Sequence, residues 1–302
     1  MDLRQLQALV AVADHGTFSA AADALATVQS NVSTHIRRLE REVGATLVDR
    51  QAGRLTQEGE AVVERARRIQ QELDALVADV AALGHDVIGR VRAGIIGTTA
   101  RWMVPLLLDE MGERHPHVEL EIVDATSTSL EPQLVNGRLD LAVVNLPMAS
   151  REIVTEWLFS EDLLLFVPAD DPLAKRRSVS VRDLRDIRLF LPPRGTAFRE
   201  LVAAAAAAQD VVLVPRAELD GIRLIASLAI AGKGPAILPA TAIPPNLQTN
   251  VKPVAVRDLP RREVGVALRR RALPGAPARA FLDVLRSILA DRSKRPDHVH
   301  VG

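Results

Sequence analysis

The chain contains no cysteine and no tyrosine, and only 3% of its 302 residues are aromatic. The absence of cysteine excludes disulfides, thiolate zinc sites and cysteine nucleophiles. The absence of tyrosine removes the phenol as a catalytic acid, base or nucleophile. Because aromatic side chains are scarce, a ligand pocket built from stacked rings is not favoured.

Long apolar runs are also missing from the sequence. None approaches the roughly 20 residues that a membrane-spanning helix needs. The chain begins Met-Asp-Leu-Arg-Gln-Leu, without the basic and then apolar segments of a secretory signal. We therefore expect a cytoplasmic protein that does not enter a membrane, with a length that allows about two or three domains.

The sequence has no excess of charge of either sign, because 38 basic residues balance 38 acidic ones. This balance argues weakly against a nucleic-acid partner, since binding to phosphates usually needs a basic surface. The local distribution differs from the overall one. Residues 29–54 carry five arginines and three acidic residues, whereas residues 59–88 have an acidic excess. Charge alone therefore decides nothing about the partner.

Residues 1–58 predict short helices followed by a wing. Apolar residues recur at helical spacing up to Gly16, a residue type that commonly ends helices. Thr17 is suited to cap the next helix, and Gly44 ends a third one. The predicted elements are a helix ending at His15, helices over 18–25 and 29–42, and short extended arms over 47–50 and 54–56.

The third of these helices has the composition of a helix that reads DNA. Base edges are recognised by side chains that form hydrogen bonds, with cations beside them for the phosphates. The start of the helix is polar and uncharged, and arginines follow, while Val32, Ile36 and Leu39 are spaced to hold it on its neighbours. The polar series is Gln29, Ser30, Asn31, Ser33 and Thr34, followed by Arg37 and Arg38.

Residues 59–88 predict one long helix without proline. Its apolar residues are separated by alternating steps of four and three, the spacing of a coiled coil, and this favours pairing with a second copy. The alternative is a helix that lies on its own domain, which would need a wider apolar stripe. The apolar series is Val62, Ala66, Ile69, Leu73, Leu76, Val80 and Leu83.

From Gly89 onward, strands and helices alternate, which predicts an α/β region with a parallel sheet and crossover helices. The region is long enough for two lobes, and its polar tail, 292–302, is expected to be mobile. Predicted strands are 91–96, 118–123, 139–144, 163–167, 189–191, 211–214, 235–238 and 264–268. Predicted helices are 101–114, 128–137, 197–208, 220–231 and 278–291.

The order of residues between Gly16 and Gly59 resembles that of the LysR-type transcriptional regulators. The matching residues are Gly16-Thr17-Phe18-Ser19-Ala20-Ala21-Ala22, Leu25, Gln29-Ser30, Val32-Ser33, Ile36, Leu39-Glu40, Gly44, Leu47, Arg50, Leu55-Thr56 and Gly59. Val48 and Asn31 depart from the pattern, where the family usually has Phe and commonly has Pro or Ala. Weaker matches in the same order follow at Pro105, His115-Pro116, Gly137-Arg138-Leu139-Asp140, Gly232-Lys233-Gly234 and Leu238-Pro239.

The resemblance implies a fold of three parts, in which an all-α winged helix-turn-helix and a long linker helix precede an α/β effector-binding domain. That domain would be similar in fold to periplasmic binding proteins. The implied bounds are 1–58 for DNA binding, 59–88 for the dimerising linker helix and 89–302 for the effector domain, with lobe I at about 89–162 and 267–302 and lobe II at about 163–266.

The resemblance also implies a function, which is ligand-responsive, sequence-specific regulation of transcription. Paired linker helices would place two heads on an imperfect palindrome of double-stranded DNA. The chain would form a dimer or tetramer, bind a small-molecule effector and influence RNA polymerase. Implied DNA contacts are Thr17, Ser19, Gln29, Ser30, Asn31, Ser33, Thr34, Arg37, Arg38, Arg50 and Arg54.

Three predicted strands of the α/β region run into hydroxyl-bearing segments that begin helices. Ligands bind at such strand ends in two-lobed α/β folds, where free N–H groups are available. Arg194 is the only cation in these segments, which favours an anionic ligand. By the resemblance, Thr98, Ser127 and Asn145 fall at effector positions, and residues 220–224 would line lobe II. The candidate effector residues are Thr98, Thr99, Thr126, Ser127, Asn145, Arg194, Gly195 and Thr196.

Two other functions fit the sequence less well. A constitutive or architectural DNA-binding protein would use the α/β region only for assembly. An α/β enzyme is less favoured, because no Ser/His/Asp grouping has a recognisable spacing. His115 and His117 flank a proline in what reads as a connector, without a third metal ligand. We therefore expect no catalytic residue, no metal and no cofactor.

Overall fold

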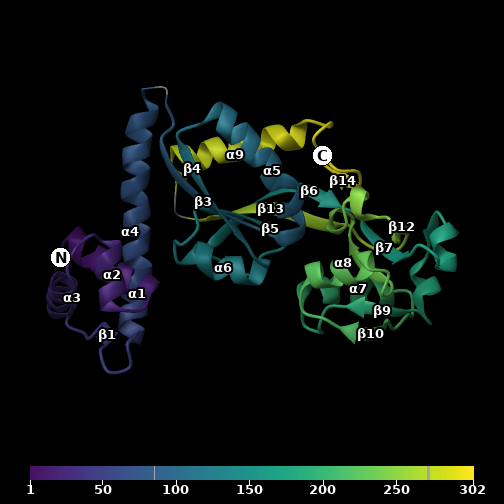
Figure 1. Cartoon of the computed structure of the whole chain (residues 1–302), viewed down its shortest axis with the longest axis horizontal. Helices are drawn as coiled ribbons and strands as arrows, with labels where there is room; N and C mark the ends of the chain where they lie inside the picture. The colour runs from purple at the N-terminus through teal and green to yellow at the C-terminus, as the bar shows by residue number, and fades with distance from the viewer. Residues whose placement is uncertain (85, 271–272) are drawn as a thin grey trace.

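The computed structural model describes residues 1–84, 86–270 and 273–302. A helical head and one long helix stand beside a two-lobed α/β domain (Figure 1). The α-helices are α1 Leu3–His15, α2 Phe18–Ala24, α3 Gln29–Val43, α4 Gln57–Ala82, α5 Gly97–Arg114, α6 Ser127–Val135, α7 Ala197–Ala207, α8 Ile222–Ile230 and α9 Ala276–Ala290.

The strands form a small wing and two six-stranded sheets, one for each lobe. Both large sheets contain parallel and antiparallel neighbours, so the strand–helix alternation of the sequence does not give a purely parallel sheet. The strands are β1 Val48–Asp49, β2 Arg54–Leu55, β3 Gly89–Ile95, β4 Val118–Asp124, β5 Leu141–Asn145, β6 Ile153–Glu161, β7 Leu163–Pro168, β8 Ser178–Val179, β9 Arg188–Leu191, β10 Val214–Glu218, β11 Ala236–Pro239, β12 Val251–Val256, β13 Arg262–Arg269 and β14 Val299–His300.

The head is built as a helix-turn-helix, as expected from the sequence. Gly16 ends α1 with φ 76°, a left-handed conformation that favours glycine, and Thr17 caps α2 by accepting a hydrogen bond from the Ala20 N–H. Val32, Ile36 and Leu39 of α3 are buried, at 1%, 0% and 0% exposure, against α1 and α2. This apolar contact fixes which face of α3 remains free.

The wing joins the head directly to the long helix. Strands β1 and β2 pair antiparallel, and Thr56 caps α4 by accepting a hydrogen bond from the Gly59 N–H. A Cβ added at Gly59 would lie 2.0 Å from the Leu47 carbonyl oxygen, so the wing and α4 approach too closely for any side chain there. The start of α4 is therefore locked to the head.

Helix α4 is shorter than the predicted 59–88, because it runs from Gln57 to Ala82 and β3 already begins at Gly89. Its apolar series is divided between two surfaces. Ala66 is buried in the core of the head, with Val62 packed against it, so this part of the helix lies on its own domain. The remaining members are exposed along the C-terminal part of α4: Ile69, Leu73, Leu76, Val80 and Leu83.

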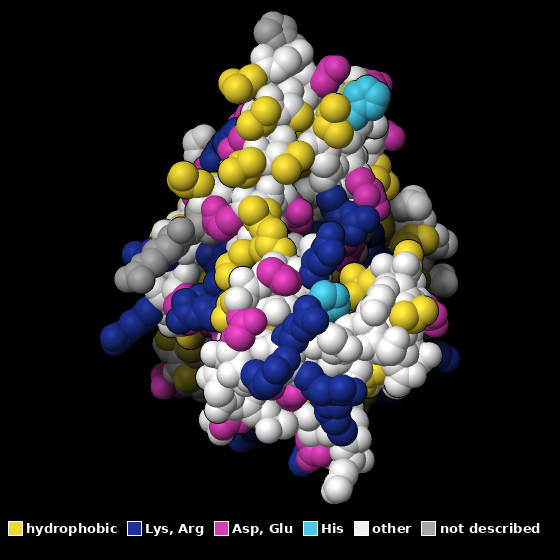
Figure 2. All heavy atoms as spheres, turned by 90° about the vertical axis from the view of Figure 1, so that its left-hand side faces the viewer, with side chains coloured by type: hydrophobic (Ala, Val, Ile, Leu, Met, Phe, Trp, Pro, Cys, Tyr) yellow, Lys and Arg dark blue, Asp and Glu magenta, His cyan; other side chains and the backbone are white. Residues whose placement is uncertain are grey.

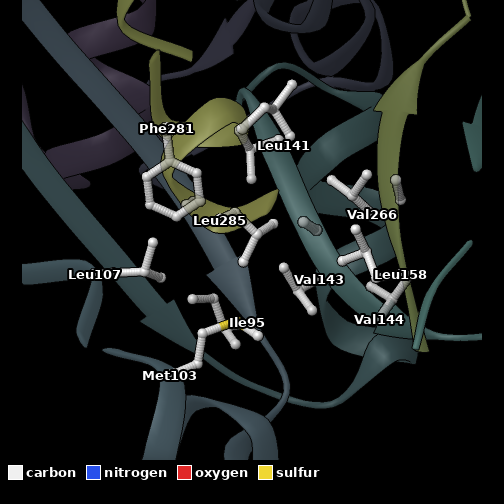
Figure 3. Close-up of a cluster of buried hydrophobic side chains, with 14 of the residues drawn as sticks. Ile95, Met103, Leu107, Leu141, Val143, Val144, Leu158, Val266, Phe281 and Leu285 are labelled. Atoms are coloured by element: carbon white, nitrogen blue, oxygen red, sulfur yellow. The ribbon is translucent and has the colours of Figure 1, made fainter. Parts of the chain in front are cut away.

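Lobe I is a sheet covered by helices on both faces, with α5 and α9 on one side and α6 on the other (Figure 1). Its strand order is β14-β6-β13-β5-β3-β4. Figure 3 shows part of the core, in which Phe281 and Leu285 of α9 point toward Ile95 and Val143 of the sheet. This rigid core positions the strand ends that face lobe II.

Lobe II has the strand order β10-β9-β11-β7-β12-β8. The chain enters it after Glu161, where β6 ends, and returns with β13 at Arg262. The return lies earlier than the expected boundary between 266 and 267. The reason is that β13 spans Arg262–Arg269 and pairs with β5 and β6 of lobe I over its length.

The C-terminal tail is ordered by contacts, which corrects the expected mobility of residues 292–302. Strand β14 pairs with β6 through Val299 and His300. Asp162 accepts hydrogen bonds from His298 Nδ1 and His300 Nε2, both at 3.0 Å. The tail is therefore fastened where the chain crosses from lobe I to lobe II.

Two long strands, β6 and β12, are absent from the sequence prediction.

Among the described residues, no helix combines the length and the apolar character needed to cross a membrane.

Candidate DNA-binding surface and effector cleft

The free face of α3 carries the polar residues singled out in the sequence. Gln29, Ser30, Asn31, Thr34, Arg37 and Arg38 are exposed, and Ser33 is half-buried. The buried residues Val32, Ile36 and Leu39 occupy the opposite face, so the polar series points away from the head. This is the geometry that a helix needs to enter a DNA groove.

Several of these side chains already have partners within α3. The Arg37 guanidinium donates to Ser33 Oγ at 2.9 Å, and Thr34 Oγ1 donates to the Ser30 carbonyl at 2.8 Å. The Asn31 amide donates to Thr27 Oγ1 at 3.1 Å, just before the helix. These contacts hold the side chains in place but leave donors and acceptors free for a partner.

The wing presents Arg50 and Arg54, both exposed. Arg50 lies over the Phe18 ring, with its guanidinium carbon 5.7 Å from the ring centroid, and it pairs with Glu40 at 3.4 Å. Glu40 also accepts hydrogen bonds from the Leu47 and Val48 N–H groups. One carboxylate of α3 therefore positions both the wing backbone and its arginine. Thr17 and Ser19 are exposed at the start of α2.

The candidate effector residues of lobe I meet at one edge of its sheet. In the parallel ladders, Ile95 pairs with both Asp124 and Val143, so the ends of β3, β4 and β5 lie side by side. The Asn145 N–H donates to Ser127 Oγ at 2.9 Å, which ties the end of β5 to the start of α6. Thr126 caps α6, so its hydroxyl has a structural role as well.

The Thr98 hydroxyl is less available to a ligand than its position in the sequence suggests. It is 6% exposed, and its hydroxyl accepts a hydrogen bond from Arg262 at 2.9 Å. Arg262 also forms a buried ion pair with Glu161. Thr98 is therefore part of the crossing between the lobes.

Thr99 differs from Thr98, because it is fully buried and its hydroxyl has no hydrogen-bond partner among the described residues. The side-chain amide oxygen of Asn145 and the indole nitrogen of Trp102 are also buried atoms without a partner among the described residues. Buried polar atoms are rarely left unpaired in proteins. Two of these three residues, Thr99 and Asn145, belong to the predicted effector site.

The predicted lobe II contacts begin after β9. Arg194 is 77% exposed at its side chain, and its nearest carboxylate is Glu218 at 4.0 Å. Arg199, which the sequence analysis missed, is 5% exposed and lies 3.5 Å from the same Glu218. Gly195 and Thr196 form the turn before α7, and the Gly195 N–H donates to Glu200. A more buried cation, Arg199 of α7, thus lies beside the exposed Arg194.

Among the described residues, an ion pair and several hydrogen bonds join the two lobes. Arg223 of α8 forms an ion pair with Asp124 at the end of β4. Thr241 Oγ1 donates to the Thr98 carbonyl at 3.4 Å, and Arg101 donates to the Ala242 carbonyl at 3.2 Å. The sequence placed residues 220–224 beside the cleft but gave no sign of the partner Asp124.

The head and α4 are connected to lobe I by polar contacts. Asp14 at the end of α1 forms an ion pair with Arg67 of α4 and lies 3.7 Å from Arg138 of lobe I. Further along α4, the Gln71 amide donates to Asp140 at 2.8 Å. Burial, opposed by hydrogen bonds from the Arg92 backbone and Gln71, raises the pKa of Asp140 above its usual value. These polar contacts therefore connect lobe I to the head within one chain.

Within the described parts of the chain, no group of three or more histidine, aspartate or glutamate side chains is arranged to hold a metal. His115 caps the end of α5 and His117 precedes β4, as a connector between helix and strand requires.

Two family models match the sequence and together cover most of it. The model described as "Bacterial regulatory helix-turn-helix protein, lysR family" matches residues 3–60. The model described as "LysR substrate binding domain" matches residues 84–290, more than half of the chain. The matched ranges correspond to the head and the two-lobed domain.

Several named proteins are similar in sequence to nearly the whole chain. The "DNA-binding transcriptional dual regulator OxyR" of Escherichia coli is 29% identical over 97% of this chain and 96% of its own length. The "Probable hydrogen peroxide-inducible genes activator" of Mycobacterium leprae is 30% identical over 94% of this chain and 93% of its own length.

Solved structures show the same fold. A full-length OxyR cysteine variant from Pseudomonas aeruginosa has a TM-score of 0.77 at 24% identity, covering 97% of this chain and 96% of that one. The regulator CbnR in complex with its target DNA has a TM-score of 0.69 at 23% identity, and the match covers 95% of this chain and 99% of that one.

Proposed function

The chain belongs to the LysR family of transcriptional regulators, and we propose that its effector is a small ligand with a carboxylate or similar anionic group, held between its lobes. It is a ligand-responsive, DNA-binding regulator of transcription. DNA binding is supported by the exposed polar face of α3, on a head that contacts lobe I through Asp14 and Arg138. The anionic class of the effector is supported by Arg194, an exposed cation in the segment before α7.

The DNA-contacting residues are proposed from the surface of the head. Residues 29–34 would read base edges in the major groove, while Arg37 and Arg38 contact the backbone beside them. Arg50 and Arg54 of the wing, with Thr17 and Ser19, would contact phosphates. The solved CbnR complex with DNA supports this assignment by its fold.

Self-association is proposed to use the exposed part of α4. Hydrophobic side chains gather on the upper part of the face in Figure 2, where the C-terminal half of α4 lies. Two such helices side by side would bury Leu73, Leu76 and Val80 and place two heads on the half-sites of an imperfect palindrome. Effector domains would then pair dimers into a tetramer.

The effector is proposed to bind without covalent chemistry. Relatives are named for induction by hydrogen peroxide, but this chain contains no cysteine, the side chain that peroxide oxidises reversibly to a sulfenic acid or disulfide. The proposed ligand contacts are Thr99, Ser127, Asn145 and the segment 194–196. Binding would favour one arrangement of the lobes and so alter the spacing of the heads and the access of RNA polymerase, in the cytoplasm where bacterial DNA lies.

Footprinting of the full-length protein on the DNA flanking its own gene tests this function. We expect protection of two half-sites and a change of footprint with an anionic metabolite from a screened panel. A footprint that no ligand alters would favour a constitutive architectural protein. Turnover of a panel member would favour an enzyme.

A further inference from the structure

Arg223 of α8 and Asp124 at the end of β4 form an ion pair between the lobes, beside the start of α5. A Cβ added at Gly97, the first residue of α5, would lie 2.9 Å from Asp124 Oδ1 and 3.4 Å from Arg223 Nε. Any side chain at residue 97 would therefore push into the pair. Glycine at this position leaves a small space, here called the cradle, between the α5 backbone, the Asp124 carboxylate and the Arg223 guanidinium.

The start of α5, a helix of 18 residues, has no side-chain cap. Ile96, the N-cap residue of α5, makes no side-chain hydrogen bond to the first turn. Within the part of the chain that the structure describes, the N–H groups of Gly97, Thr98 and Thr99 donate to no protein acceptor. Such a helix end attracts an anionic group through its free donors and its dipole.

A second observation points to a ligand at this place. Thr99 is fully buried in the first turn of α5, and its hydroxyl has no partner. The side-chain oxygen of Asn145, at the end of the neighbouring β5, is buried and unpaired as well. Because Ile96 donates to the Val143 carbonyl, these two strand ends are adjacent. Both unpaired atoms therefore belong to residues at or next to the start of α5, and neither has a partner among the described residues.

The charges of the cradle define which molecule fits. A ligand with only a carboxylate would take Arg223 and leave Asp124 facing a second anion. A ligand with only an ammonium group would take Asp124 and leave Arg223 without a counter-ion. In a ligand with both groups, the carboxylate takes the place of Asp124 beside Arg223, and the ammonium takes the place of Arg223 beside Asp124. No charge is then left uncompensated.

We propose that the cleft takes a small zwitterion of the α-amino-acid class, with its carboxylate on Arg223 and the start of α5 and its ammonium on Asp124. The inference rests on the proposed function of the cleft as the effector site. It names the chemical class of effector and assigns Arg223, rather than Arg194, as the cation that selects it. Exchange of the internal ion pair for the ligand would also release a direct contact between the lobes.

Calorimetric titration of the full-length protein without DNA tests the inference. The probes are the standard amino acids and, for each one that binds, the corresponding carboxylic acid without the amine and the amine without the carboxylate. We expect at least one amino acid to bind, with at least about tenfold weaker binding for each truncated analogue.

Two variants identify the residues responsible. Asp124→Asn should remove the preference for the amino acid over its amine-free acid, and Arg223→Gln should weaken both at least about tenfold. Arg176→Gln is the matched control and should change neither, because Arg176 belongs to an exposed ion pair with Asp183 that lies outside the proposed ligand contacts. Arg223 and Asp124 are partly exposed surface residues, so folding should survive, as circular dichroism would verify.

Two results would overturn the inference. One is the absence of binding by every amino acid at millimolar concentration. The other is equal binding of an amino acid and its amine-free acid to the unsubstituted protein. If such an acid also alters the DNA footprint, the proposed function stands while the zwitterion does not, so the two failures remain distinguishable.

Discussion

Glu161 and Arg262 form a buried ion pair at the two points where the chain passes between the lobes. The Glu161 side chain is 0% exposed and that of Arg262 is 6% exposed. Glu161 also accepts a hydrogen bond from the Thr241 N–H at 2.6 Å, and Arg262 donates to Thr98. One pair therefore connects the last residue of β6, the first of β13 and both walls of the cleft.

Removing one member of this pair should be costly. Arg262→Ala would leave Glu161 buried without its counter-ion, and we expect a loss of about 3–5 kcal/mol in the free energy of unfolding. Arg261→Ala is the control, because its ion pair with Asp162 is 53% exposed on the arginine side and should contribute less than about 1 kcal/mol. Urea denaturation of both variants measures the difference, and equal losses would contradict a special role for the buried pair.

Arg37 should contact a DNA phosphate. Arg37→Ala is expected to weaken binding to operator and unrelated DNA alike and to reduce the slope of log affinity against log salt by about 1. Arg41→Ala, which removes another exposed arginine of α3 outside the predicted contacts, should leave the slope unchanged. Titration by fluorescence anisotropy at several salt concentrations gives both slopes. An unaltered slope for Arg37→Ala would remove it from the contacts.

The exposed part of α4 should pair two chains. Leu76 is 60% exposed, and Leu76→Glu would place a charge in the centre of the proposed helix–helix contact, so we expect dissociation at micromolar concentration. Gln70→Glu adds the same charge on another face of α4 and should preserve the assembly. Sedimentation velocity distinguishes the two, and an intact assembly for Leu76→Glu would place the interface elsewhere.

The histidines of the tail should support stability at neutral pH through Asp162. Burial acts to raise the pKa of Asp162, but hydrogen bonds from His298, His300 and Arg261 outweigh it and lower that pKa below its usual 3.8. A lowered pKa contributes stability that is present above the unfolded-state value and is lost as pH falls through the folded-state value. Replacing both histidines with glutamine should therefore lower stability at pH 6 and flatten its acid dependence below about pH 4. Urea denaturation across this range is the measurement, and parallel curves would count against the tail contact.

Gly59 should tolerate no side chain. In Gly59→Ala, the new methyl group would meet the Leu47 carbonyl oxygen, and we expect a loss of at least about 1–3 kcal/mol. Gly112→Ala is matched, because nothing lies within 4 Å of a Cβ there and residue 112 is within α5. That control should gain about 0.5–1 kcal/mol in thermal or urea unfolding. Similar effects for the two changes would contradict the close approach.

Local patterns were sufficient to predict the helices of the head, because their caps and apolar spacings lie within a few residues. They were insufficient for β6 and β12. Strand β12 contains Pro253, which weakens a strand pattern, and β6 exposes Thr155, Glu156 and Trp157 in succession, so neither shows regular alternation.

The site shows the same division between local and long-range information. The polar start of α3 and the hydroxyl-rich strand ends were visible in the sequence. The pairing of Asp124 with Arg223 was not, because the two residues lie 99 positions apart and meet only when the lobes fold against each other. Order in the tail likewise depends on Asp162, which is far from it in sequence.

Helix α4 has a mechanical consequence that follows from where it is held. Its 26 residues span about 39 Å at about 1.5 Å per residue, with the head fixed at one end and contacts to lobe I further along. From Gln71, which contacts lobe I, to Gln57 at the head is about 21 Å, so a tilt of about 10° about this contact would carry the head through about 4 Å, about one base-pair step of about 3.4 Å. In the proposed mechanism, the helix would act as a lever arm that converts a rotation of lobe I into a change of the bases that α3 faces.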